Sequence, residues 1–197
     1  MLLMSNLSDQ NRIRALDAAL VIFARYGYQR SSMADIAKEA GVSRPSLYLW
    51  FASKPALFNA LADHLKVQAL SGARAAWSAD RDFAANLEAS ILAKDLTFYG
   101  LLHASPHGAE LMSVDAALTA RMVADLDAGF AATLAERAAE AVSAGQIDLA
   151  AFQDPADFGR TLGLLASGLK HEARSEPEWR AAVTALCRMT ARAVQRR

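Results

Sequence analysis

The chain has 197 residues, of which 53% are hydrophobic and 21% are charged, so it can bury a sizeable core in one or two domains. Basic and acidic residues number 21 each, which argues against the strongly basic class of nucleic-acid-binding proteins. The single cysteine, Cys187, excludes an intrachain disulfide and a cysteine-rich zinc site.

The first residues lack a basic segment followed by a long apolar run, so we expect no signal peptide. Charge-free stretches elsewhere are too short and too polar to span a bilayer. We therefore expect a soluble, cytoplasmic protein with no membrane partner.

Apolar residues recur every three or four positions and strand-like alternation is missing, which predicts an all-α fold. The first helix is expected over about residues 9–26, capped by Ser8 or Asp9. Its buried stripe is predicted to contain Ile13 and Phe23, and Gly27 follows as a stop signal.

Residues 32–57 contain three further helix starts in close succession. Ser32 and Asp35 have the spacing of a capping box, and Gly41 ends the helix that they begin. Ser43 and Ser53 each precede a proline in the first turn of a new helix, where the missing N–H of proline is not needed. Longer helices are expected over about residues 83–104 and 116–143, with a short one at 108–113 and two more after Asp154 and Ser175.

Charge is distributed unevenly along this arrangement. Residues 1–54 contain seven Lys/Arg and four Asp/Glu, a formal charge of +3, and the remainder carries −3. Such a difference fits an anion-binding module on a larger carrier, although an asymmetry this small also arises by chance.

The order helix, glycine turn, helix over residues 32–51 is that of a helix-turn-helix, whose second helix enters the DNA major groove. With Leu47 and Phe51 packed inward, Arg44 and Tyr48 share the opposite face, where an arginine can bond a guanine edge. The predicted DNA-contacting residues, including short donors for phosphates and Lys54 at a helix start, are Ser32, Ser43, Arg44, Pro45, Ser46, Tyr48, Leu49, Trp50 and Lys54.

The string SSMADIAKEAGVSRPSLYLWFASKPALF closely resembles the TetR family of bacterial transcription regulators. The matching positions, within a resemblance that covers about residues 9–65, are Ala18, Phe23, Gly27, Ser32, Ile36-Ala37, Gly41-Val42, Tyr48, Phe51 and Ser53-Lys54-Pro55-Ala56-Leu57. Trp50 departs from the His or small polar residue common there, which leaves open whether position 50 contacts DNA or only packs.

The resemblance implies an N-terminal helix-turn-helix DNA-binding domain, at residues 1–54, followed by a linking helix at about 55–76. It also implies a larger helical domain at 77–197 for ligand binding and dimerisation, in a homodimer that binds a double-stranded DNA operator. Apolar stripes in the last two helices fit a bundle across a two-fold axis, or packing within one chain. The predicted interface residues are Phe158, Leu162, Leu165, Leu169, Trp179, Val183, Leu186 and Thr190.

Large apolar residues in the middle of the chain suit a pocket for a small, partly apolar effector, or an ordinary core. The candidate ligand-lining residues are Trp77, Phe98, Leu102, His103, Met112, Met122, Leu126 and Phe130. His103, His107 and Glu110 have metal-ligand spacing, but Pro106 interrupts the helix, so we expect no metal and no cofactor.

No nucleotide-binding or nucleophile motif is present, so we expect no enzyme. The favoured hypothesis is a ligand-responsive repressor that binds a palindromic operator. The alternatives are an activator, a ligand-independent DNA-binding protein, or a ligand-sequestering protein whose helix-turn-helix is idle.

Overall fold

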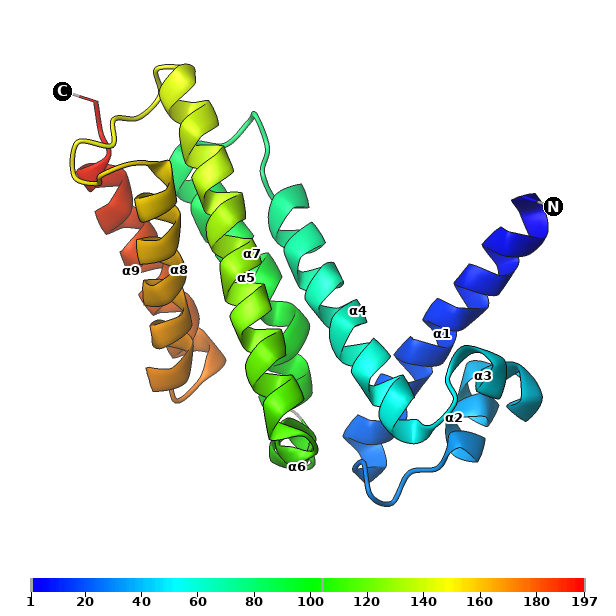
Figure 1. Cartoon of the computed structure of the whole chain (residues 1–197). Coiled ribbons are helices and arrows are strands. Elements are labelled where there is room, and N and C mark those ends of the chain that lie inside the picture. The colour runs from blue at the N-terminus through cyan, green and yellow to red at the C-terminus, as the bar shows by residue number, and fades with distance from the viewer. Residues whose placement is uncertain (1, 104, 197) are drawn as a thin grey trace. The chain divides into compact units, whose positions relative to one another are not determined.

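The structure, a computed structural model, describes residues 2–103 and 105–196, and the side chains of residues 2–7, 97–103 and 171 lie outside the description. All regular elements in the described residues are α-helices, which confirms the all-α prediction (Figure 1). In chain order they are α1 (Leu2–Tyr26), α2 (Met33–Ala40), α3 (Arg44–Trp50), α4 (Lys54–Ala75), α5 (Phe83–His103), α6 (Gly108–Ser113), α7 (Ala116–Ser143), α8 (Pro155–Glu172) and α9 (Glu176–Ala193). Of the described helices, none has the length and apolarity needed to cross a bilayer.

The chain divides into two compact units. Unit 1 comprises residues 1–66 and 98–122, and unit 2 comprises residues 67–97 and 123–197. Unit 1 thus contains the predicted N-terminal domain together with residues 98–122, which we expected in the second domain.

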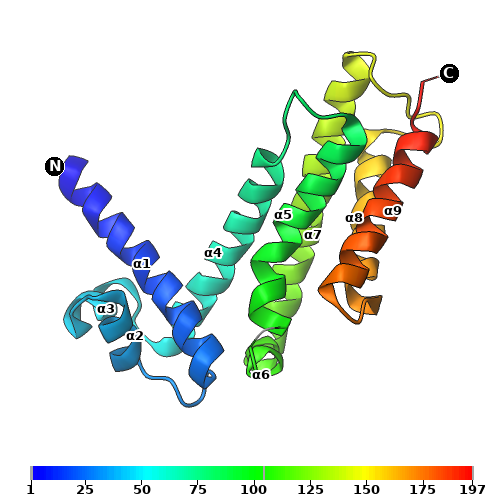
Figure 2. The ribbon, with the colours of Figure 1, turned by 180° about the vertical axis from the view of Figure 1, so that it is seen from behind.

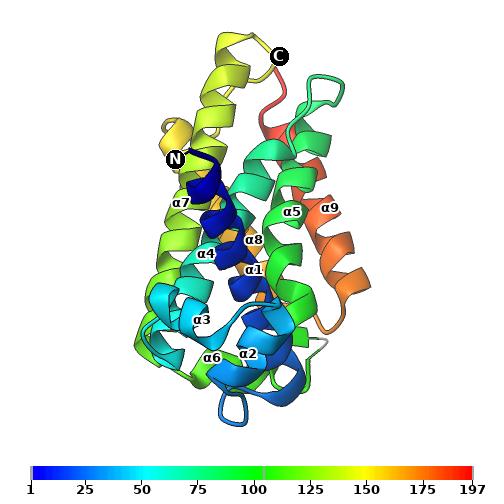
Figure 3. The same cartoon turned by 90° about the vertical axis from the view of Figure 1, so that its right-hand side faces the viewer.

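In unit 1, α2 and α3 pack against α1 around one apolar cluster (Figure 3). Leu16 and Phe23 of α1, Ile36 of α2 and Leu47 of α3 are each no more than 1% exposed. Ile13, which we expected in the buried stripe of α1, is 43% exposed. The reason is that neighbouring alanines and Ile22 form the packed face instead. The helix also begins at Leu2 rather than near Asp9, because the first residues contain no glycine or proline to stop it.

The predicted caps of α2 and α3 are confirmed, whereas Ser8 and Asp9 lie within α1 and do not cap it. Ser32 and Asp35 form a reciprocal capping box at the start of α2. Gly41, with φ of 66°, ends α2 in the left-handed conformation that glycine adopts without steric cost. Ser43 then caps α3 by accepting a hydrogen bond from the backbone N–H of Ser46. These caps fix a tight turn between α2 and α3.

In unit 2, α5 and α7 lie beside α8 and α9, as the two opposite views in Figures 1 and 2 both show. Gly159 permits close packing of α8 on α7, since a Cβ there would lie 2.2 Å from the carbonyl oxygen of Ala131. Cys187 is buried in this unit, and burial, with a smaller effect from Glu88, raises its pKa to about 12. The thiol therefore stays protonated at neutral pH.

Candidate nucleic-acid interface

Helix α3 is held in unit 1 by one side of its short length. Leu47 is fully buried and Phe51, the residue that caps its C-terminal end, is 3% exposed. Both side chains belong to the apolar cluster formed with α1 and α2. Because α3 is anchored through these residues, its other face is fixed in orientation rather than free to rotate.

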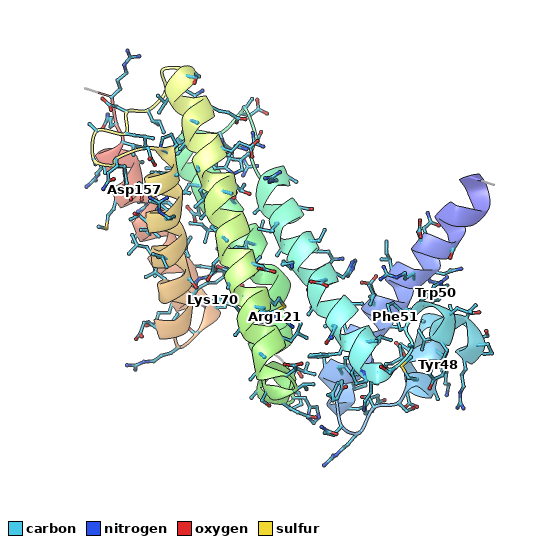
Figure 4. The ribbon with its side chains drawn as sticks, in the orientation of Figure 1. Tyr48, Trp50, Phe51, Arg121, Asp157 and Lys170 are labelled. Atoms are coloured by element: carbon cyan, nitrogen blue, oxygen red, sulfur yellow. The ribbon has the colours of Figure 1, made fainter. Side chains whose placement is uncertain are left out.

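The opposite face of α3 is open to solvent. Arg44 and Pro45 are exposed, Tyr48 is 51% exposed and Leu49 is 85% exposed. Figure 4 labels Tyr48 and Trp50 on this helix and Phe51 directly after it. The exposed set combines a guanidinium with a phenol and apolar groups, which are the groups that read base edges and contact thymine methyls or deoxyribose.

The serines near α3 are engaged within the protein. The Ser43 hydroxyl lies 2.8 Å from the Ser46 hydroxyl and accepts the Ser46 backbone N–H at 3.1 Å. The Ser32 hydroxyl donates to the Asp35 carboxylate, which also accepts the Ser32 backbone N–H. These hydroxyls already form hydrogen bonds at helix starts. A phosphate contact would have to be made in addition to these bonds or in place of them.

Asp35 is stabilised as a carboxylate by this cap. Hydrogen bonds from the Ser32 hydroxyl and then from its backbone N–H lower the pKa of Asp35, and the charges of Arg44 and Lys38 add to the effect. The capping box is therefore retained at neutral pH, and it fixes the start of α2 beneath the exposed face of α3.

Lys54, which we predicted as a phosphate contact, is engaged within unit 1. Its ammonium donates to the backbone carbonyls of Tyr28, at 2.8 Å, and Ser31, at 2.9 Å. It also lies 4.4 Å from the centroid of the Tyr28 ring. Two of its three N–H donors are thus occupied. Lys54 ties the start of α4 to the loop between α1 and α2, a tertiary contact that local sequence does not reveal.

Trp50 and Arg12 complete the surroundings of α3. Trp50 is half-buried and packs against the apolar cluster of unit 1. Arg12, which we did not predict, is exposed and places its guanidinium 5.1 Å from the Phe51 ring centroid. Arg14, two residues on, donates to the carbonyl of Ala40 at 2.9 Å. The Arg-x-Arg spacing of Arg12 and Arg14 is the one sequence feature from which a basic group beside α3 could have been predicted.

The predicted ligand-lining residues fall in different parts of the chain. Leu126 and Phe130 are buried in unit 2, where Trp77 lines a hollow of about 300 Å³ together with Phe83, Asn86 and Arg137. Met122 is half-buried and Met112 is 36% exposed, both in unit 1. The side chains of Phe98, Leu102 and His103 lie outside the described residues.

His107 and Glu110 serve a structural contact. His107 Nδ1 lies 3.2 Å from Glu110 Oε2, while Glu110 Oε1 accepts the backbone N–H of Gln29 at 3.0 Å. The hydrogen bond from Gln29 is the main cause that lowers the pKa of Glu110. In the described residues no group of three or more His, Cys, Asp or Glu side chains could hold a metal.

The predicted interface residues divide by burial. Phe158, Leu162, Trp179 and Val183 are at most 1% exposed within their own chain, and Thr190 is 6% exposed. Leu169 and Leu186 are half-buried, whereas Leu165 is 49% exposed. The most exposed apolar side chains of α8 and α9 are Leu164, at 72%, and Met189, at 69%. Periodicity found the apolar stripes but did not distinguish the inner face from the outer one.

Comparison with known proteins agrees with this geometry. Residues 15–61 match the family model described as bacterial regulatory proteins, tetR family. The chain is 34% identical over 70 residues to an uncharacterised HTH-type transcriptional regulator, YvdT, of Bacillus subtilis, covering 36% of each chain. It is 40% identical over 53 residues to the HTH-type transcriptional repressor ComR of Escherichia coli, covering 27% of this chain and 25% of ComR. The matched segments thus span about a third or less of these curated relatives.

The fold is shared over nearly the whole chain. A TetR-family transcriptional regulator from Mesorhizobium loti superimposes with a TM-score of 0.69 at 18% identity, over 96% of this chain and 98% of that one. The curated relatives and the solved structure described here are all described as regulators. Residues 15–61 thus match the tetR family of bacterial regulatory proteins, and the fold of the chain is similar to that of a solved TetR-family regulator.

Proposed function

We propose that this protein is a DNA-binding transcriptional regulator that reads a palindromic operator with α3. The observation that carries the proposal is the anchoring of α3 through Leu47 and Phe51, with Arg44 and Tyr48 exposed on the other face. A recognition helix must be held rigidly while its base-reading groups stay free. The segment that matches the tetR family contains this same helix.

Repression by occupancy of a promoter is the favoured mode, in a cytoplasmic setting where the DNA is accessible. The matched segment does not separate the two modes, because ComR is named a repressor and FasR of Mycolicibacterium smegmatis, 36% identical over 83 residues, is named an activator. Activation remains the alternative, because the reading helix is the same in both modes. An idle helix-turn-helix is disfavoured by the exposed apolar and cationic face of α3.

A homodimer is proposed through the outer faces of α8 and α9. Leu164 and Leu165 are exposed on α8, and Met189 is exposed on α9. Gly168, one turn after Leu164, has open space around its Cβ position, which allows a partner helix to approach. Two-fold pairing would present two copies of α3 to successive half-sites.

We further propose that an effector binds in the helical part that follows the DNA-binding domain of residues 1–54 and its linking helix at 55–76. Buried Leu126 and Phe130 support an apolar lining there. An effector changes DNA binding only if the DNA-competent and DNA-incompetent conformations differ in their affinity for it.

The proposal is tested with the full-length protein and a labelled duplex taken from directly upstream of its own gene. Fluorescence anisotropy is measured at two salt concentrations, with a scrambled duplex of the same composition as control. Sequence-selective binding that weakens steeply with salt is expected, since phosphate contacts release counterions. Equally weak binding to both duplexes would contradict the choice of operator and of α3 as a reading helix.

A further inference from the structure

Three charged side chains meet inside unit 2. Lys94 and Asp95 come from α5 and are 1% and 0% exposed. Lys170, which Figure 4 labels, comes from α8. Asp95 Oδ1 accepts a hydrogen bond from Lys170 Nζ at 3.0 Å and lies 3.2 Å from Lys94 Nζ. We call these three residues the Lys-Asp-Lys cluster. Lysine and aspartate side chains are almost never fully buried unless they are paired, as they are here.

The cluster is incomplete as an internal ion pair. Both lysines face the same carboxylate oxygen, while Asp95 Oδ2 is buried and has no hydrogen-bond partner among the side chains and backbone that the structure describes. A buried acceptor without a partner carries its full desolvation cost. The two ammonium groups also outnumber the one carboxylate, so the cluster has a formal charge of +1. A ligand that completed the cluster would donate one hydrogen bond to Asp95 and bring one negative charge to the lysines.

An apolar wall lies directly beside these charges. Lys94 Nζ is 4.6 Å from the centroid of the Phe130 ring, which is itself fully buried. The ring face offers the ammonium a partial cation–π stabilisation but does not neutralise it. Lys170 is the accessible member, since its side chain is 22% exposed. A small molecule that approached past Lys170 would meet a cation, a carboxylate oxygen and an aromatic face together.

We propose that the Lys-Asp-Lys cluster recognises the effector, and that this effector is a small organic acid with a hydroxyl or amino group beside its carboxylate. The effector carboxylate would accept hydrogen bonds from Lys94 and Lys170, each of which has three N–H donors. Its neighbouring donor would satisfy Asp95 Oδ2, and its carbon skeleton would pack on Phe130. The inference rests on the proposed function, whose effector class it names.

The test uses pairs of molecules that differ only in charge. Salicylate and mandelate carry a carboxylate next to a hydroxyl, and salicylamide and mandelamide have the same shape without the charge. Binding to the full-length protein is measured by isothermal titration calorimetry and by the rise in melting temperature. We expect at least one carboxylate to bind, with its amide weaker by about tenfold or more, because charge-assisted hydrogen bonds are the stronger kind.

Variants tie binding to the cluster. Lys94→Met and Lys170→Met should each weaken carboxylate binding by about tenfold or more, whereas Arg174→Met, which removes an exposed cation from the same unit, should not. Circular dichroism checks that each variant is folded. If Lys94→Met does not fold, the test uses Lys170→Met, because Lys170 is partly exposed. Equal binding of acid and amide, no binding of either acid up to about 10 mM, or full affinity in a folded lysine variant would each overturn the proposal.

The same samples separate this proposal from the proposed function. Anisotropy with the upstream duplex is measured with and without the bound carboxylate. Binding that depends on Lys94 and Lys170 but leaves DNA affinity unchanged would uphold the anion site and contradict the ligand response. Failure of the protein to select its DNA, with carboxylate binding intact, would contradict the DNA-reading function alone.

Discussion

Replacement of Lys54 by methionine tests whether this residue is a tertiary anchor or a phosphate contact. The change keeps most of the aliphatic stem and removes the ammonium that donates to the carbonyls of Tyr28, at 2.8 Å, and Ser31, at 2.9 Å. Each hydrogen bond to a charged group contributes about 1.5–3 kcal/mol when it is protected from water. The site is half-buried, so water can replace part of both bonds.

We therefore expect Lys54→Met to lower the free energy of unfolding by about 2 kcal/mol, near the lower end of that range. For a chain of this size the melting temperature should fall by about 4–8 °C. Urea and thermal unfolding followed by circular dichroism measure both quantities. Lys38→Met is the matched control, because Lys38 is exposed on α2 and its loss should change stability by less than about 0.5 kcal/mol.

The salt dependence of DNA binding completes this test. As an anchor, Lys54 should leave the slope of log affinity against log salt unchanged once the variant is folded. A loss of stability no larger than that of Lys38→Met, with a slope reduced by about one phosphate contact per protomer, would refute the anchoring role. Lys54 would then be a phosphate contact, as its position at a helix start first suggested.

Four further substitutions have definite expected outcomes. Gly159→Ala should cost about 3 kcal/mol in urea unfolding, because its Cβ would meet the Ala131 carbonyl oxygen, a backbone atom, at 2.2 Å. At Gly163, on the same helix, an added Cβ would lie in ordinary van der Waals contact with Ala131, so Gly163→Ala should raise the free energy of unfolding by about 0.5–1 kcal/mol. Equal changes in stability for the two variants would show that α7 and α8 are not this close. Leu164→Asp should shift the protein from dimer to monomer in sedimentation without loss of helicity, and an unchanged dimer would place the interface elsewhere. Asp35 has a pKa lowered by Ser32, so its cap stabilises the fold above the unfolded pKa and loses this effect as pH falls through the folded value. The stability difference between wild type and Asp35→Asn should therefore shrink below about pH 4, and a constant difference would exclude the charge as its cause.

Local signals predicted the parts of the fold that depend on neighbours in sequence. The Ser32 and Ser43 caps and the Gly41 turn were all expected and are present, because capping uses residues three or four positions apart. The pairing of Lys54 with the Tyr28 and Ser31 carbonyls joins residues more than twenty positions apart, and no local pattern encodes it.

Periodicity was less informative about which apolar face is covered. Trp179 and Leu164 both belong to amphipathic helices, yet one is fully buried and the other is 72% exposed. The helical period shows that a face is apolar but not which element packs on it. The burial of Lys94 and Asp95 was not predicted either, because adjacent charged residues in a sequence normally indicate a helix face exposed to solvent.

The reading of DNA by α3 is tested most directly by Arg44→Ala, with Arg174→Ala as control, on the upstream duplex and its scrambled counterpart. Our account predicts a loss of about 1–3 kcal/mol in binding free energy on the upstream duplex, little change on the scrambled one, and no effect of the control. An equal loss on both duplexes would show that Arg44 contacts phosphate only. No loss on either would contradict the assignment of α3 as the reading helix.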